Sequence, residues 1–221
     1  MDEIRLPFAN RQVVARLLAK RLKAYAGTNP LVLAIPRGAV SMGKIIAEEL
    51  QGELDVVLVR KIGAPFQPEL AIAAVDESGY VYRNPQTEAW QISKEYFQQE
   101  KEKQLQLIQQ RRRQYTPNRG PAKVEARNVI VVDDGIATGA TMIAALHAIR
   151  SQNPQRLIVA TAVAPPHTVE LLQTYADEVV CLASPEDFAA VGQFFRDFSQ
   201  VSDEEVIEVL RLSVKPPRSI S

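Results

Sequence analysis

This 221-residue chain is poor in cysteine, the residue that disulfides and many metal clusters require. It has one cysteine, which excludes an internal disulfide and a zinc cluster. Cys181 lies in the apolar run 179–182, so we expect a buried strand thiol rather than a nucleophile. A single thiol fits a reducing compartment, and a cytoplasmic protein is the expectation.

The chain also lacks net charge and long apolar segments. Lysine plus arginine and aspartate plus glutamate number 26 each, which argues against a general nucleic-acid binder or a membrane-surface protein. No run approaches the roughly 20 apolar residues of a membrane span. Residues 1–10 do not have the charged-then-apolar build of a signal peptide. We therefore expect neither nucleic-acid nor membrane partners.

Short apolar runs alternate with helical patterns along most of the chain. The predicted strands are 31–35, 55–59, 129–132, 157–163 and 178–182. The predicted helices are 9–26, before the first strand, and 40–50, 142–150 and 168–175, between later strands. Such alternation builds a parallel sheet with helices on both faces. We predict a single α/β domain over 1–221 with about five parallel strands, and a flexible tail at about 215–221.

The alternation breaks in an insertion at about 62–127, which is longer than one crossover needs. Two apolar stretches flank a turn at 76–79, a pattern that predicts a hairpin. Residues 93–115 then read as a long polar helix. We predict that the hairpin and the long helix form a hood or cap. The basic triplet 111–113 is interpreted as a solvated helix end, with a dimer contact or a phosphate-facing patch as alternatives.

The most informative segment is 129–141, which reads VIVVDDGIATGAT. Four apolar residues typical of a buried strand precede two carboxylates, and a loop of small residues then opens a helix. The first N–H groups of that helix are unpaired and point back at the loop, where they and the helix dipole favour a phosphate. Gly135 and Gly139 let the backbone turn tightly and approach a ligand. The segment predicts a phosphate cradle beside two acids that can hold a diol or a metal.

This segment resembles the diphosphosugar-binding motif of type I phosphoribosyltransferases. The resemblance implies that Asp133 and Asp134 grip the ribose hydroxyls of phosphoribosyl pyrophosphate, or the waters of a Mg²⁺ ion bound with it. It also implies that the loop binds the 5′-phosphate of the same ligand. The predicted binding residues in this segment are Asp133, Asp134, Gly135, Ile136, Ala137, Thr138, Gly139, Ala140 and Thr141. The alternative is a generic strand-to-helix turn, which needs neither the double acid nor the two spaced threonines.

Other loops extend the resemblance. Arg37 and Gly38 follow the first strand, where the family binds pyrophosphate, often through a strained peptide. Arg60 and Lys61 end the predicted second strand, where related enzymes carry basic residues that lead into a mobile loop. Fixed cations would stabilise the departing pyrophosphate, so these two residues join the acid pair as catalytic candidates, with solvated charges as the alternative. The phenylalanine-rich segment 184–198 could stack a flat base, or it packs on the sheet edge.

The resemblance implies an enzyme that transfers the phosphoribosyl group to a nitrogenous base or related acceptor and releases pyrophosphate. Ala137 stands where hypoxanthine and guanine enzymes carry an aspartate, which disfavours a 6-oxopurine acceptor. The whole chain is similar to predicted phosphoribosyltransferases without an agreed substrate. One alternative is a non-catalytic sensor of phosphoribosyl pyrophosphate or a nucleotide. A weaker one is a hydrolase with the paired acids as metal ligands. Related enzymes are often dimers, so a homodimer stays open.

Overall fold

The structure, a computed structural model, describes residues 4–83, 87, 90, 92–117 and 119–213. At its centre is a parallel sheet with the strand order β2-β1-β6-β7-β8. Its strands are β1 (Leu31–Ala34), β2 (Glu53–Val56), β6 (Asn128–Asp133), β7 (Arg156–Val163) and β8 (Glu178–Ala183). The predicted five-stranded parallel sheet is thus confirmed. The expected tail at 215–221 lies outside the described residues.

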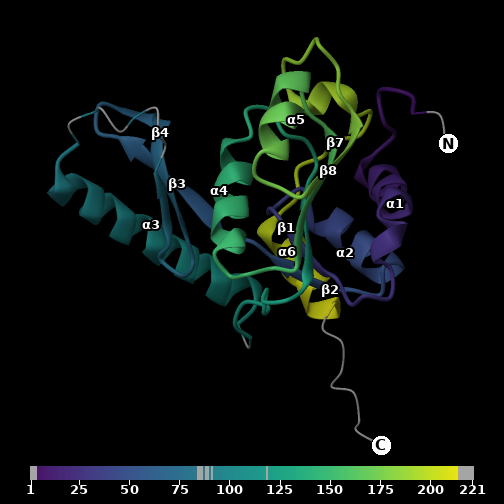
Figure 1. Ribbon diagram of the computed structural model, residues 1–221, viewed down its shortest axis with the longest axis horizontal. Helices are drawn as coiled ribbons and strands as arrows, with labels where there is room; N and C mark the ends of the chain where they lie inside the picture. Colours follow the sequence, from purple (N-terminus) through teal and green to yellow (C-terminus); the bar gives the residue numbers. More distant parts are fainter. Residues whose placement is uncertain (1–3, 84–86, 88–89, 91, 118, 214–221) are drawn as a thin grey trace, which may run out of the picture.

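Helices cover both faces of this sheet (Figure 1). One face carries α1 (Arg11–Arg21), the short 3-10 helix η1 (Lys23–Tyr25) and α2 (Val40–Glu49), and the other carries α4 (Ala140–Arg150) and α5 (Pro166–Gln173). The chain then runs through a short 3-10 helix, η3 (Val191–Phe194), into α6 (Asp203–Leu212), which packs on α2.

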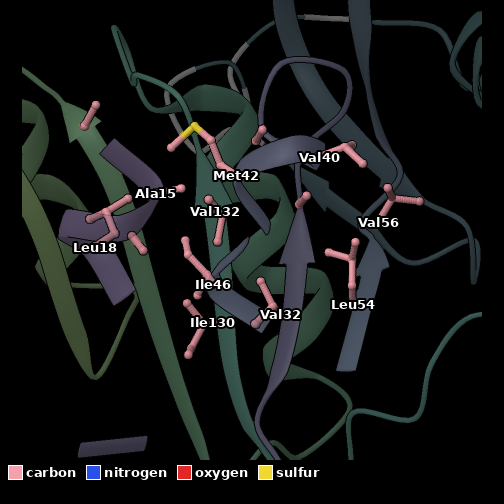
Figure 2. Packing of buried hydrophobic residues seen from close by; sticks show 14 of the residues in the cluster. Ala15, Leu18, Val32, Val40, Met42, Ile46, Leu54, Val56, Ile130 and Val132 are labelled. Carbon is pink, nitrogen blue, oxygen red and sulfur yellow. The ribbon is translucent and has the colours of Figure 1, made fainter. Parts of the chain in front are cut away.

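The apolar strands follow from this two-sided cover. Alternate residues of β6 point to opposite faces: Ile130 joins the core under α1 and α2, whereas Val131 joins the core under α4. Figure 2 shows the first of these cores, with Leu18 and Ile46 packed over the middle strands. Because β1 and β6 are buried on both sides, their core residues are apolar throughout rather than alternating.

Side-chain caps fix where α1, α3 (Lys94–Tyr115) and α6 begin. Asn10 precedes α1, and its side-chain oxygen accepts a hydrogen bond from the Val13 amide at 3.0 Å. Ser202 and Glu205 form the capping box of α6, as the sequence pattern indicates. The Asn10 cap places Arg11 at the first position of α1.

The insertion forms a separate layer beside the main sheet, here called the hood and defined as residues 59–83 and 92–115 (Figure 1). It holds the antiparallel strands β3 (Val59–Ala64), β4 (Gln67–Asp76) and β5 (Val81–Arg83), and the long helix α3 (Lys94–Tyr115). One face of this small sheet packs on α3 and the other contacts α4. The Tyr82 ring stacks on His147 of α4 at a centroid distance of 3.9 Å. The predicted hairpin and long helix are confirmed.

The predicted second strand, 55–59, was wrong in its extent. β2 ends at Val56, and Val59 already belongs to β3 of the hood sheet. The run from Asp55 to Lys61 is apolar and then basic, so no Gly or Pro marks the point where the chain leaves one sheet for the other. Arg60 and Lys61 consequently lie inside a paired strand of the hood sheet rather than at the end of a core strand.

A buried cluster of charges anchors the hood to the core. Arg112 of α3 donates to both Glu77 oxygens, to Asp55 at 2.8 Å and to the Val56 carbonyl. Asp55 is fully buried and also accepts from Arg119 and from the Ala122 amide. The interpretation of 111–113 as a solvated helix end is therefore wrong for Arg112, whose neighbours in space come from β2 and the β4–β5 turn.

The segment before α1 pairs with the segment that follows η3. Phe8 pairs with Phe195 through backbone hydrogen bonds, and the two rings lie 5.8 Å apart. Phe194 and Phe195 are buried, so the phenylalanine-rich segment packs inward over the sheet edge. Stacking of a base on this segment stays a prediction.

Candidate active site

The acid pair lies where β6 ends. Asp133 is the last residue of that strand, and its Oδ1 accepts a hydrogen bond from the Asp134 amide at 2.9 Å. Burial, reinforced by the neighbouring Asp134 carboxylate, raises the pKa of Asp133 well above its usual range. The two acids therefore have different environments. Asp133 is buried at the end of β6, whereas Asp134 contacts α1 through Arg11.

Asp134 is held by a residue that the motif does not contain. Its Oδ2 accepts a hydrogen bond from Arg11 Nε at 2.8 Å, and both side chains are only 13% exposed. Arg11 lines a cavity of about 610 Å³ between the beginnings of α1 and α2 and the C-terminal segment that includes α6. The acid pair thus engages in one internal ion pair, whose arginine lines this cavity whereas neither acid does.

The candidate phosphate-binding loop, residues 137–141, is here called the phosphate loop, and it leads from Ile136 into the first turn of α4. Ile136 is buried and donates its amide to the Val163 carbonyl, which ties the beginning of the loop to β7. Gly139 then adopts φ +77°, a conformation that favours glycine, and α4 begins at the next residue. In the described part of the chain, no residue caps the α4 N-terminus with a side chain. The first amides of α4 are therefore available to an anion.

Two contacts support this loop from behind. Thr168 of α5 donates to the Ala137 carbonyl at 2.6 Å. A Cβ added to Gly135 would lie 2.3 Å from a Val191 methyl, so the glycine lets the C-terminal segment close against the loop. Thr138 is exposed and Thr141 is half-buried. Neither hydroxyl makes a hydrogen bond within the described residues. This leaves both free to donate to a ligand.

The loop after β1 reaches the acid pair. Arg37 is exposed, the Pro36–Arg37 peptide bond is cis, and Gly38 packs directly on Asp134. A Cβ on Gly38 would lie 2.2 Å from Asp134 Oδ2 and 3.2 Å from Arg11 Nε. The structure therefore brings together Gly38 and the acid pair, which are almost a hundred residues apart in the sequence.

Arg60 and Lys61 lie on the other side of the phosphate loop. Both line a cavity of about 580 Å³ that also includes Thr141 and, from α3, Lys103. Arg60 Nε donates to Gln104 at 2.6 Å, and Lys61 is exposed. Although the strand assignment was wrong, the hood does place both cations beside the phosphate loop.

Comparison with known proteins decides the family. The model of the phosphoribosyl transferase domain matches residues 8–198. The chain belongs to this phosphoribosyl transferase family. Its acid pair, phosphate loop and Gly38 loop all lie inside the matched region.

Similar proteins agree with this family. Two Mycobacterium tuberculosis proteins, each named "Putative phosphoribosyl transferase", are 40% identical over 204 residues, covering 92% of this chain and 46% of their own length. The chain thus spans about half the length of these curated relatives. The crystal structure of TT1426 from Thermus thermophilus is 41% identical, with a TM-score of 0.85 over 95% of this chain and 100% of that one.

The acid pair is the candidate Mg²⁺ site of this chain. Within the described residues, no three His, Cys, Asp or Glu side chains cluster in a way that could hold a metal. The paired carboxylates Asp133 and Asp134 nevertheless fit Mg²⁺, which usually binds one or two carboxylates and completes its shell with water and substrate phosphates.

In the same described ranges, no helix has the length and apolar character to cross a membrane.

Sequence reasoning missed two features of this phosphoribosyl transferase fold. Arg11 pairs with Asp134 across 123 positions, and Arg112 pairs with Asp55 across 57. The cap expected at Asn10 places Arg11 at the first position of its helix. No local pattern names its partner.

Proposed function

We propose that the protein transfers the phosphoribosyl group of phosphoribosyl pyrophosphate to a nitrogenous acceptor. The observation that carries this proposal is one juxtaposition: an acid pair in contact with the Gly38 loop, next to a helix N-terminus with free amides. Such an end suits a terminal phosphate, and carboxylates beside it suit ribose hydroxyls. In the reaction, the bond from C1 to the pyrophosphate oxygen breaks, and a bond from C1 to the acceptor nitrogen forms.

The phosphate loop would bind the 5′-phosphate. The amides of residues 137–141 and the hydroxyls of Thr138 and Thr141 are the donors in this proposal, and the dipole of α4 adds to their attraction. Gly135 and Ile136 would support the loop at its beginning. Binding at this remote end fixes C1 relative to the rest of the site, which lowers the entropic barrier to transfer.

The acid pair would bind the ribose hydroxyls. Asp133 and Asp134 would also hold a Mg²⁺ ion through its waters, and that ion would supply charge neutralisation for the pyrophosphate. Arg11 holds Oδ2 of Asp134, and the Asp133 carboxyl lies within hydrogen-bonding reach of the Asp134 carboxylate. In this proposal, Oδ1 of Asp134 accepts a hydroxyl of the ribose.

Cations around the site would stabilise the leaving group. Arg37 and Gly38 would contact the pyrophosphate, and Arg60 and Lys61 would add positive charge from the hood side. Negative charge gathers on the pyrophosphate as it departs, so fixed cations act more strongly on the transition state than on the bound substrate.

The acceptor is expected to be a nitrogenous base or related compound other than a 6-oxopurine. Ala137 cannot exchange a proton with a purine N7 as an aspartate at that position could. Screening bases for pyrophosphate release in the presence of Mg²⁺ tests the proposal. Release with any acceptor supports it. Tight binding of phosphoribosyl pyrophosphate without release from any base would favour a sensor instead.

Replacing both acids tests the assignment of the binding site. We expect the double variant Asp133→Asn and Asp134→Asn to lose phosphoribosyl pyrophosphate binding while remaining folded, because the amides keep the side-chain shape and remove the charge. Calorimetry with Mg²⁺ measures the affinity, and circular dichroism checks the fold. Unchanged affinity in the folded double variant would refute the role of the acid pair.

A further inference from the structure

Arg11 links the start of α1 to Asp134 and to the segment between η3 and α6. Its Nε donates to Asp134 Oδ2 and its Nη1 to the Ser199 carbonyl, each at 2.8 Å. Its guanidinium carbon lies 4.0 Å from the centroid of the Phe198 ring. Hydrogen bonds in two directions and a stacked ring fix both the position and the plane of this guanidinium.

The ion pair with Asp134 is shielded from water, which makes its geometry consequential. With 13% exposure on each side, the charges have lost most of their hydration, so the pair is favourable only while the hydrogen bond is well formed. Gly38 leaves no room on the same side, because a Cβ there would overlap Asp134 Oδ2. Asp134 Oδ2 is therefore confined between Arg11 and the Gly38 loop.

We propose that Arg11 is a positioning residue for the sugar site. By holding Oδ2 of Asp134, it orients the carboxylate so that the other oxygen, Oδ1, accepts a hydroxyl of the ribose diol. This inference rests on the proposed function, and it adds a residue that lies 122 positions before the motif's first acid. Arg11 acts through Asp134, so in the absence of Mg²⁺ its effect is confined to ligands that carry the diol.

A purely structural role makes a different prediction. Arg11 also ties α1 to the segment around Phe198 and Ser199, and a staple of that kind would alter thermal stability and all ligands alike. The backbone pairing of Phe8 with Phe195 already joins the segment before α1 to the segment after η3. The positioning role is therefore distinguished by ligand selectivity, not by stability.

The test follows the binding of ribose 5-phosphate and of inorganic pyrophosphate by NMR titration of the labelled 221-residue chain in the absence of Mg²⁺. Arg11→Met is expected to weaken ribose 5-phosphate binding about tenfold, the size expected for a lost charge-assisted hydrogen bond, and to leave pyrophosphate affinity within about twofold. Arg11→Lys should recover part of the loss, because a cation remains. Arg16→Met is the matched control: an exposed arginine of the same helix whose replacement should change neither affinity.

A double-mutant cycle with Asp134→Asn decides whether Arg11 acts through Asp134. In that background, Arg11→Met should cost little further affinity for ribose 5-phosphate, because the orientation it provides no longer matters. Two losses that multiply, or an equal loss for pyrophosphate, would overturn the positioning role. If Arg11→Met does not fold, Arg11→Lys carries the same comparisons.

The experiment separates this inference from the function on which it rests. A wild-type chain that binds neither phosphoribosyl pyrophosphate nor ribose 5-phosphate overturns both. A wild-type chain that binds them, with Arg11→Met and Arg11→Lys binding ribose 5-phosphate equally well, overturns only the role of Arg11.

Discussion

At the scale of single residues, the site depends on two glycines, whose lack of a side chain lets other groups approach closely. Gly38 and Gly135 permit two close approaches, to Asp134 and to Val191, that a methyl group would block. Glycine therefore contributes here by removing volume at a crowded junction. The sequence suggested tight turns at such glycines, but the particular neighbours follow from the tertiary structure.

Replacing Gly38 with alanine should damage the site. The new methyl carbon would overlap Asp134 Oδ2, so the carboxylate must move away from Arg11 or the loop must shift. We expect a loss of about 1–3 kcal/mol in the free energy of unfolding, typical of overpacking, together with weaker sugar-diphosphate binding. Chemical denaturation and calorimetry measure the two effects.

Gly120→Ala is the control for that substitution, because nothing lies within 4 Å of its added Cβ. Its free energy of unfolding should stay within about 0.5 kcal/mol of the wild-type value. A Gly38→Ala variant with wild-type affinity would show that the contact between Gly38 and Asp134 is not needed.

Cys181 provides a residue-scale test of the β8 assignment. Burial raises the pKa of its thiol to about 11, and the thiol donates a hydrogen bond to the Ala183 carbonyl. Only the thiolate reacts, so alkylation by iodoacetamide should be slow at pH 8 and accelerate as the pH rises toward that value. A rate profile with its midpoint near the pKa of a free thiol would contradict this placement.

At the scale of elements, the hood depends on one buried arginine. Arg112 joins α3 to β2 and to the turn between β4 and β5, and this turn itself is stabilised by Asp76 accepting from the Ser78 and Tyr80 amides. The hood in turn carries Arg60 and Lys61 to the phosphate loop. Arg60 and Lys61 lie on β3, which packs on α3. Their placement therefore depends on the contacts of Arg112, near the C-terminal end of α3.

Arg112→Met should destabilise the protein strongly. It leaves Asp55 buried with part of its hydrogen bonds gone, and breaking a buried pair in this way costs about 3–5 kcal/mol. The midpoint of guanidinium chloride unfolding measures the loss. Arg113→Met, an exposed neighbour in the same triplet, should change stability by no more than about 0.5 kcal/mol. Equal small effects of both substitutions would show that the cluster does not anchor the hood.

At the scale of the whole molecule, local patterns were enough for the order of strands and helices in the main sheet and for the strand–loop–helix form of residues 129–141, whose phosphate binding stays a prediction. Apolar runs mark strands buried on two faces, and residues 129–141 carry their strand, acids and helix start in one continuous segment. The boundary between β2 and β3 was missed because apolar residues continue through the change of sheet. The pairings of Arg11 and Arg112 were missed because they join residues distant in sequence, where periodicity gives no information.

The account rests on the claim that the amides at the beginning of α4 bind a sugar phosphate while the adjacent acids hold its hydroxyls. The most direct measurement is an NMR titration of the ¹⁵N-labelled protein with phosphoribosyl pyrophosphate and Mg²⁺. We expect the largest amide shifts at residues 137–141, with further shifts at Asp133 and Asp134. Saturable binding that leaves these amides unmoved, with the shifts concentrated elsewhere in the chain, would contradict the account.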